Sequence, residues 1–329
     1  MRKASGVVLV GLGLFALVLT ILLPTVVVDR SKKTPLDLNI TQVSSGPAKV
    51  LDVNTNQVKD VRLQATRVVK TNSHFSNGSK TTVFETLCIV ISQGNNTPKC
   101  VRAPDPRLLS VTTDQVTADR RSAESVHVAA WNENINGKPA THTGLSYKWP
   151  IDAKKKTYQF FQPDLGKAFP AVYQGTSTIK GLKVYKYVSA TGVQPYKVQG
   201  LVDGTYDDTR TVWVEPRTGA IINGVEHQVQ KIGGTQLALE TTLSFEQSAI
   251  DFQANYAQGK IDKLKQAQLW GPLILGIVAL ASFIGAYFLL RRRSSGGTDG
   301  EGERRHDQPT PDDDPNFAEP PVWAGSSQT

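Results

Sequence analysis

Two long uncharged runs lie near the ends of the chain, and apolar and polar residues alternate in much of the region between them. The second run, residues 269–290, contains no charged residue and is followed directly by Arg291, Arg292 and Arg293. As an α-helix it would rise roughly 33 Å, enough to cross a bilayer hydrocarbon core of about 30 Å. Because arginine favours the cytoplasmic side, the run predicts a transmembrane helix with a cytoplasmic C-terminal end and Trp270 at the opposite interface.

The first run predicts a second membrane anchor. No charge occurs between Lys3 and Asp29, and the run is longer than the apolar core of a signal peptide, which is about 7 to 15 residues. Arg2 and Lys3 precede it, so the N-terminus is also expected in the cytoplasm. A cleaved first segment is the alternative.

The two anchors together predict a two-pass protein of the cell membrane. The expected parts are an N-terminal transmembrane anchor at 1–28, an exported β-rich domain at 29–245, a juxtamembrane helix at 246–268, a transmembrane helix at 269–290 and a disordered cytoplasmic tail at 291–329. The tail is rich in Gly, Pro, Asp and Glu and has almost nothing to bury. The large domain is expected on the extracytoplasmic side, with both termini in the cytoplasm.

The exported domain reads as a series of strands. Residues 184–188 and 237–241 alternate strictly between apolar and polar, which suits strands with one face on a core and one in water. Strands are predicted at 49–53, 61–69, 82–91, 125–131, 182–190, 210–214, 220–230 and 236–245. Helical interruptions are predicted at 113–123 and 165–173. The expected fold is mainly β (α+β), a curved antiparallel sheet or half-barrel with a few helices between two transmembrane helices.

A long helix is expected to close the domain. Ser244 and Gln247 have the spacing of a capping box, and an apolar stripe at alternating steps of four and three residues follows: Ile250, Ala254, Ala257, Ile261 and Leu264. The stripe predicts either a helical stalk that runs on to residue 290, bent at Gly271 and Pro272, or a helix packed on its own sheet.

The chain has only two cysteines, Cys88 and Cys100. The turn signal at residues 94–96 would fold the two sulfurs towards each other, and outside the cytoplasm such a pair forms a disulfide. A metal site would need more ligands, and a redox pair usually has Cys-x-x-Cys spacing. A structural Cys88–Cys100 disulfide is therefore predicted.

Charge suggests a class of partner without deciding it. The whole chain carries a formal charge of +8, although the segment after residue 293 is acidic, so the exported part is strongly basic. Such a domain would be attracted to anionic lipid headgroups or acidic glycans. The lysines and arginines are scattered, and solubility explains them equally well.

Motifs for chemistry are mostly absent, including nucleophile elbows, Walker loops and zinc-protease motifs. Asp207 and Asp208, beside Tyr206, are interpreted as a solvated turn. Isolated histidines are more often packed or surface residues than ligands, and four occur here: His74, His127, His142 and His227. No catalytic residue, metal or cofactor is predicted, and the chain is expected not to be an enzyme.

Aromatic residues concentrate in the middle of the domain. A sheet curved around them would enclose an apolar groove for acyl chains with lysines at a polar mouth, whereas an ordinary core is the alternative. The predicted ligand-binding residues are five rings, Trp149, Phe160, Phe161, Tyr187 and Trp213, and three lysines, Lys154, Lys155 and Lys156.

Five segments carry a resemblance to a known family: DRRSAESV from Asp119, GLSYKWP from Gly144, KKTYQFFQPDLGKAFPA from Lys155, GLKVYKY from Gly181 and VWVEPRTGAIINGVEHQ from Val212. They resemble the two-span porin-A-family envelope proteins of mycolic-acid actinobacteria, and the resemblance covers nearly the whole chain. The family includes a membrane protein associated with lipomannan and lipoarabinomannan maturation, which implies a role in lipoglycan assembly.

The expected function is therefore a non-enzymatic, membrane-anchored envelope protein that binds a lipid or lipoglycan precursor and assists lipomannan and lipoarabinomannan maturation. Expected partners are the membrane, an anionic glycolipid of the phosphatidylinositol mannoside type and envelope glycosyltransferases, and no nucleic acid. The alternatives are an adaptor subunit of a glycosyltransferase or transporter complex, an enzyme on envelope sugars, and a porin. A porin is ranked low because it needs a closed barrel with an apolar outer band.

Overall fold

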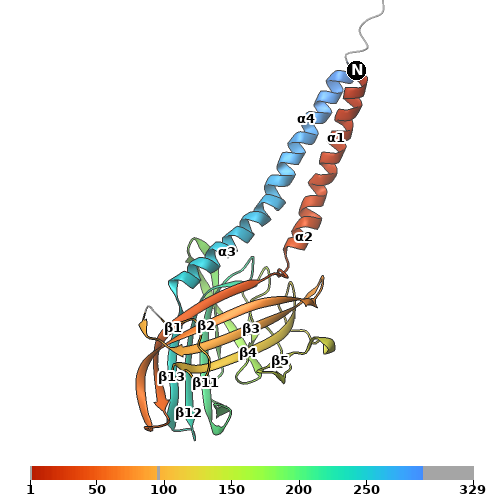
Figure 1. Ribbon diagram of the computed structural model, residues 1–329. Helices are drawn as coiled ribbons and strands as arrows, with labels where there is room; N and C mark the ends of the chain where they lie inside the picture. The colour runs from red at the N-terminus through yellow and green to blue at the C-terminus, as the bar shows by residue number, and fades with distance from the viewer. Residues whose placement is uncertain (1, 95–96, 292–329) are drawn as a thin grey trace, which may run out of the picture.

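The computed structural model describes residues 2–94 and 97–291, and two helices rise side by side from a β-rich domain (Figure 1). Helix α1 (Arg2–Leu22) continues through a π-helical turn (Leu23–Val27) into α2 (Val28–Ser31). Near the other end, α3 (Gln247–Lys265), a second π-helical turn (Gln266–Trp270) and α4 (Gly271–Arg291) follow one another without a break. Both helical segments are long and apolar enough to cross a membrane. The predicted tail at 291–329 lies outside the described residues except for Arg291, which ends α4.

Each π-helical turn lies next to a proline, Pro24 in the first and Pro272 just after the second. Proline has no N–H to complete the regular helical ladder, so the neighbouring carbonyls are free to bond one residue further along. The bend predicted near Gly271 and Pro272 accordingly falls at the π-helical turn Gln266–Trp270.

The apolar helices α1 and α4 pack antiparallel, with the N-terminal end of α1 beside the C-terminal end of α4 (Figure 1). Gly13 lets them approach closely, because a β-carbon there would lie 3.0 Å from the ring of Phe283. The helix pair thus has the hairpin form that the sequence predicts.

The domain is one antiparallel sheet of thirteen strands that curves without closing (Figure 1). The strands are β1 (Asn39–Asp52), β2 (Gln57–Ser76), β3 (Lys80–Ile91), β4 (Leu108–Asp119), β5 (Asn134–Ile135), β6 (Lys138–Pro139), β7 (Tyr158–Gln162), β8 (Lys167–Ile179), β9 (Leu182–Ala190), β10 (Gln194–Val198), β11 (Val202–Glu215), β12 (Ala220–Ile232) and β13 (Gln236–Phe245). Their order is β6-β5-β4-β3-β2-β1-β13-β12-β11-β9-β8-β7, with β10 paired to β11 off this path. The predicted mainly β fold with a curved antiparallel sheet is confirmed.

Three local predictions are wrong. The expected helix at 113–123 lies largely in β4, whose full-length pairing with β3 outweighs a weak helical pattern. The expected helix at 165–173 lies largely in β8. Its Pro170 is tolerated because pairing with β9 begins only at Ala171. The expected strand at 125–131 is instead irregular and ends in a short 3-10 turn, Ala129–Trp131.

Helix α3 carries the predicted apolar stripe. Ala254, Ala257 and Ile261 are buried against Leu182 and Ile222 of the sheet. The stalk and the packed helix therefore occur together, since the same helix packs on the sheet and continues into α4. The predicted capping box does not form: the helix begins at Gln247 after Glu246 with no side-chain cap, because Ser244 is held in the β13 ladder.

The predicted disulfide joins Cys88 of β3 to Cys100 in the segment between β3 and β4. The two Cα atoms are 5.7 Å apart, within the usual range for a disulfide. The disulfide prediction is confirmed.

A glycine in the turn between β11 and β12 yields a stability prediction. Gly219 has a φ of +71°, and its carbonyl accepts a 3.0 Å hydrogen bond from the N–H of Trp149. A β-carbon there would collide with the carbonyl oxygen of Trp149, whereas Gly166, with a φ of +63°, has no atom within 4 Å of that position. We expect Gly219→Ala to lower the free energy of unfolding by about 1 to 3 kcal/mol more than Gly166→Ala, because only the first adds a collision to the backbone strain. Equal losses in denaturant titrations of the purified chain would contradict this explanation.

Candidate functional site

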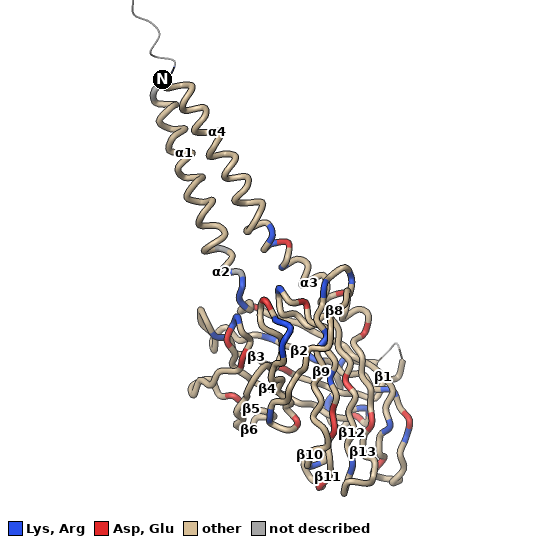
Figure 2. The backbone as a smooth tube through the Cα atoms, turned by 180° about the vertical axis from the view of Figure 1, so that it is seen from behind, with Lys and Arg blue, Asp and Glu red and all other residues tan. Residues whose placement is uncertain are grey.

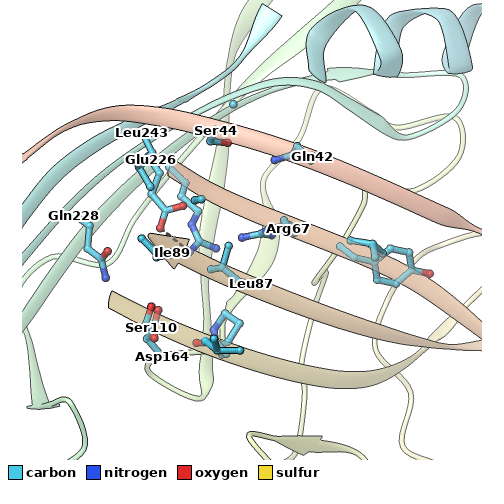
Figure 3. A pocket seen from close by; sticks show the side chains of 18 of the residues that line it. Gln42, Ser44, Arg67, Leu87, Ile89, Ser110, Asp164, Glu226, Gln228 and Leu243 are labelled. Carbon is cyan, nitrogen blue, oxygen red and sulfur yellow. Dashed lines mark hydrogen bonds and ion pairs between the residues drawn. The ribbon is translucent and has the colours of Figure 1, made fainter. Parts of the chain in front are cut away.

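A cavity of about 1610 Å³ lies in the bend of the sheet, and it is the candidate site. In β2 and β3 only residues at alternate positions line it, because successive side chains of a strand point to opposite faces. Figure 3 shows lining side chains from β1 (Gln42, Ser44), β2 (Arg67), β3 (Leu87, Ile89), β4 (Ser110), β12 (Glu226, Gln228) and β13 (Leu243). The wall therefore mixes aliphatic, polar and charged groups.

The cavity extends from the base of the helices along the sheet. Strand β1 starts soon after α2, and its lining runs from Ile40 near its start to Asp52 at its end. At the helix end the cavity is lined by Lys32 and Lys33 after α2 and by Tyr256 and Lys260 of α3. Figure 2 shows Lys and Arg gathered where α2 and α3 meet the domain. We call the end of the cavity that is lined by Lys32, Lys33, Tyr256 and Lys260 the helix-side end.

A buried charged group lies in the middle of the wall, where β11 and β12 pair. Arg210 stands directly opposite Glu226 in the strand register and donates a 2.8 Å hydrogen bond to Glu226 Oε1. Asp208, two residues before Arg210 on the same face, has its Oδ2 3.4 Å from Arg210 Nε. Gln162 Nε2 also donates to Asp208 Oδ2, at 2.7 Å. Strand pairing alone thus brings one cation and two carboxyl groups together.

The two carboxyl groups have opposite pKa shifts. Burial, followed by repulsion from Glu226, raises the pKa of Asp208 to about 8. Burial acts on Glu226 too, but the attraction of Arg210 and its hydrogen bond outweigh it and lower the pKa of Glu226. At neutral pH the pair therefore holds one proton, on Asp208, and the charge of Glu226 balances that of Arg210.

A second ion pair lies in another part of the cavity wall, between β2 and β3. The Nη1 atom of Arg67 in β2 lies 3.3 Å from Oε1 of Glu85 in β3. Arg67 also lines the cavity. Burial raises the pKa of Glu85, although Arg67 partly offsets the effect. Both arginines of the cavity middle consequently have carboxylate partners within the protein.

The five predicted ring residues are mostly in the packed interior. Trp149, Phe160 and Tyr187 belong to one core cluster, with ring centroids of Trp149 4.9 Å from Phe160 and 5.3 Å from Tyr187. Phe161 is 1% exposed and contacts His142. Trp213 is partly buried and packs against a second cluster, the one that contains Ala254 and Ala257 of α3. Phe160 alone of the five is among the cavity-lining residues.

The three predicted lysines lie on the surface, where Lys155 and Lys156 approach the rings of Tyr185 and Tyr158. None of Lys154, Lys155 and Lys156 lines the cavity. The structure thus brings together a different set of residues from the one that the sequence singled out.

The interpretation of Asp207 and Asp208 as a solvated turn is wrong for Asp208, which is 2% exposed within β11. The charged group was missed because its members come from two strands, β11 and β12, whose register the sequence does not show. One signal was present: Asp208 and Arg210 share a face of a strand that is otherwise rich in Val and Thr, and a charge at such a position needs a partner.

Two of the four histidines lie beside carboxylates, and one of them, the exposed His127, has its Nδ1 3.7 Å from Glu133 Oε2. His142 is fully buried, with its Nε2 2.7 Å from Asp114 Oδ1 and its Nδ1 3.7 Å from Glu133 Oε2. Among the described residues no group of three or more His, Cys, Asp and Glu side chains could hold a metal ion. His142 is a packed histidine with carboxylate neighbours.

The fold and cavity define a class: membrane-associated proteins in which two apolar helices carry a curved, unclosed β domain around a large cavity. A family model described as Porin PorA matches residues 5–288, so the chain belongs to the PorA family. The family resemblance seen in the sequence is confirmed.

Two curated relatives carry the same description. A Porin PorA of Corynebacterium amycolatum is 24% identical, over 90% of this chain and 100% of the relative. A Porin PorA of Corynebacterium resistens is 26% identical, over 57% of this chain and 52% of the relative. The chain thus spans about half the length of the second relative and the whole of the first.

These relatives contradict the function expected from the sequence. Both are described as porins, and neither description mentions lipoglycan maturation or lipid binding. The low rank given to a porin rested on the requirement for a strand barrel. The sheet does not close, but the family description is that of a porin all the same.

The raised pKa of Asp208 predicts a pH dependence of stability. Its folded-state pKa of about 8 lies above the ordinary value of 3.8, so between these values the folded chain binds more protons than the unfolded chain. Stability should therefore fall as pH rises from 5 to 8, with a slope of up to about 1.4 kcal/mol per pH unit for one proton. The lowered pKa of Glu226 acts at lower pH, where its contribution is lost as pH falls through the folded-state value.

Asp208→Asn should flatten this slope, because an amide stays neutral at every pH. Denaturant titrations at pH 5, 6.5 and 8 would measure the slope, with Asp203→Asn as a control at a residue in an exposed ion pair with Lys197. An unchanged slope in Asp208→Asn would show that Asp208 is ionised throughout.

Proposed function

We propose that this protein takes part in the passage of small solutes through the cell envelope and that the cavity is its solute-binding vestibule. The observation that carries the proposal is the cavity of about 1610 Å³, whose wall offers both aliphatic surface and hydrogen-bonding groups. Sites for small molecules are typically concave and apolar with a few polar groups. The description of the relatives as porins supports the same function.

The route across the membrane, in this proposal, is formed by several copies of the chain. The sheet is not a closed barrel, so its strands enclose no lumen of the usual porin type. Within one chain, α1 and α4 touch along their length, as at Gly13 and Phe283, which leaves no passage between them. Both helices expose apolar side chains, among them Phe15 and Ile277, that further copies or lipid would cover.

The proposed topology places the β domain outside the cytoplasm and both termini inside. Arg2 and Arg291 lie at the same end of the helix pair, and Lys3, Arg292 and Arg293 adjoin them in the sequence, so these cations support it through the positive-inside rule. The Cys88–Cys100 disulfide supports an oxidising compartment for the domain.

Two expectations from the sequence stay predictions: that the chain is not an enzyme, and that it contacts envelope glycosyltransferases. The glycolipid ligand belonged to the contradicted function and is not part of this proposal.

Blocking the cavity should reduce solute passage. The full chain would be reconstituted in planar bilayers and in liposomes, and conductance steps and sugar-driven swelling would be measured. We expect Gln42→Trp and Ser44→Trp, which fill the cavity from β1, to reduce both signals several-fold, since each adds a ring inside the vestibule. Thr41→Trp is the matched control, because Thr41 is exposed and points away from Gln42. No conductance from the parent chain at any protein concentration would refute the proposed function.

Protease treatment of intact spheroplasts tests the topology. A tag at the C-terminus should survive while the β domain is cut, because the sealed membrane protects the cytoplasmic side. Detergent should then expose the tag. Loss of the tag from sealed spheroplasts would reverse the proposed orientation.

A further inference from the structure

At the helix-side end of the cavity two cations have no carboxylate partner among the described residues. Five of the twelve lysines and arginines that line the cavity form ion pairs: Arg67 with Glu85, Arg210 with Glu226, Lys32 with Asp152, Lys59 with Asp52 and Lys197 with Asp203. Lys148 and Lys260 also line the cavity, and neither has a carboxylate within ion-pair distance among the described residues. The two are half-buried rather than free in solvent.

Lys148 is held in place by its neighbours in the chain. Trp149, the next residue, is fully buried and its N–H donates to Gly219, so the backbone on one side of Lys148 is fixed. The Lys148 ammonium donates to Thr34 Oγ1 at 3.3 Å, a neutral group that leaves its charge unbalanced. Burial, and then the charge of Lys260, lower the pKa of Lys148 to about 8.

Lys260 is positioned by α3. The buried stripe residues Ala257 and Ile261 lie on either side of it in sequence, so the helix cannot rotate it away from the cavity without exposing them. Its ammonium lies 5.4 Å from the ring centroid of Tyr256. Burial and the charge of Lys263 lower the pKa of Lys260, while the exposed Asp37 acts in the opposite direction.

The charge of Lys260 lowers the proton affinity of Lys148, and two half-buried cations that face one cavity are unfavourable unless an anion joins them. Lys263 also lines the cavity but is exposed, whereas Lys148 and Lys260 are half-buried. Arg217, in the turn that Trp149 contacts, is another cavity-lining cation without an ion pair among the described residues. Aliphatic wall residues lie at the same end, including Leu38 and Leu264.

We propose that Lys148 and Lys260 form an anion-binding subsite at the helix-side end of the cavity, which takes the phosphate or carboxylate of a small organic anion whose apolar part lies on the aliphatic wall. The inference rests on the proposed function, since it names the class of solute that the vestibule prefers. The middle of the cavity does not compete for the anion, because its arginines are already paired with carboxylates.

The test compares a charged probe with its neutral counterpart. The full chain in neutral detergent would be titrated calorimetrically with 1-naphthyl phosphate and with 1-naphthol. The phosphate should bind more tightly, and Lys148→Gln or Lys260→Gln should each weaken it on the order of tenfold while leaving naphthol unchanged, because only the phosphate uses the charge. Lys148→Arg and Lys260→Arg should retain most of the affinity. Lys138→Gln, at an exposed lysine that also lines the cavity, is the control and should change the affinity less than twofold.

Each outcome decides the inference. Equal affinity for the two probes would overturn it. So would folded Lys148→Gln and Lys260→Gln variants that bind 1-naphthyl phosphate as tightly as the parent chain. Repeating the titration in nanodiscs with and without anionic lipid identifies the source of the anion. A large loss of probe affinity in anionic nanodiscs would assign the subsite to membrane headgroups and overturn its assignment to solutes.

The proposed function has its own readout. Reversal potentials in the bilayer experiment should show a preference for anions that the double variant Lys148→Gln/Lys260→Gln loses. If the chain conducts without an anion preference and binds 1-naphthyl phosphate equally well without the two lysines, the subsite is overturned and the proposed function is kept. Lysine-dependent binding without any conductance would keep the subsite and overturn the function.

Discussion

A sheet that curves without closing has a hollow face that must be filled or left open to solvent, and the rest of this structure depends on how that face is used. Side chains alternate across each strand, so curvature collects one half of them in the bend. Only part of that space is filled, by the cluster around Trp149 and Tyr187. The remainder is the cavity, and α3 lies along its helix-side end.

Charges in the wall of this cavity are tolerated because strand pairing supplies their partners. Arg210 would be costly at 11% side-chain exposure without Glu226 beside it, and Glu226 is placed there by the register of β11 and β12. If Asp208 also ionised, it would place a second negative charge in the buried group. It therefore keeps its proton. The polar character of the cavity middle is therefore a consequence of sheet pairing.

The sequence predicted features that depend on local periodicity. The apolar runs, the stripe from Ala254 to Leu264 and the strands around Val184 and Leu239 all have side chains at the spacing that their elements require. Residues 108–119 and 167–179 were harder, because their strand form comes from long-range pairing that no local pattern records.

The candidate site was not predictable in the same way. Which face of a strand looks into the bend depends on the curvature of the whole sheet, so Trp149 and Tyr187 could not be told from cavity residues by composition. Lys148 and Lys260 are 112 positions apart, and only the fold brings both to one cavity. The function expected from the sequence followed one member of the family, whereas the matched relatives are described as porins.

We infer that the bend of the sheet is an open, solute-accessible space rather than a closed core. Both native cysteines are in the disulfide, so Ser110→Cys would place one free thiol in the cavity and Thr41→Cys one on the outside. We predict that a small charged methanethiosulfonate reagent modifies Cys at 110 within about tenfold of the rate at 41. A thiol in a closed core would react only on local unfolding, on the order of 1000-fold more slowly. Such a slow reaction at residue 110 would show that the bend is a closed core.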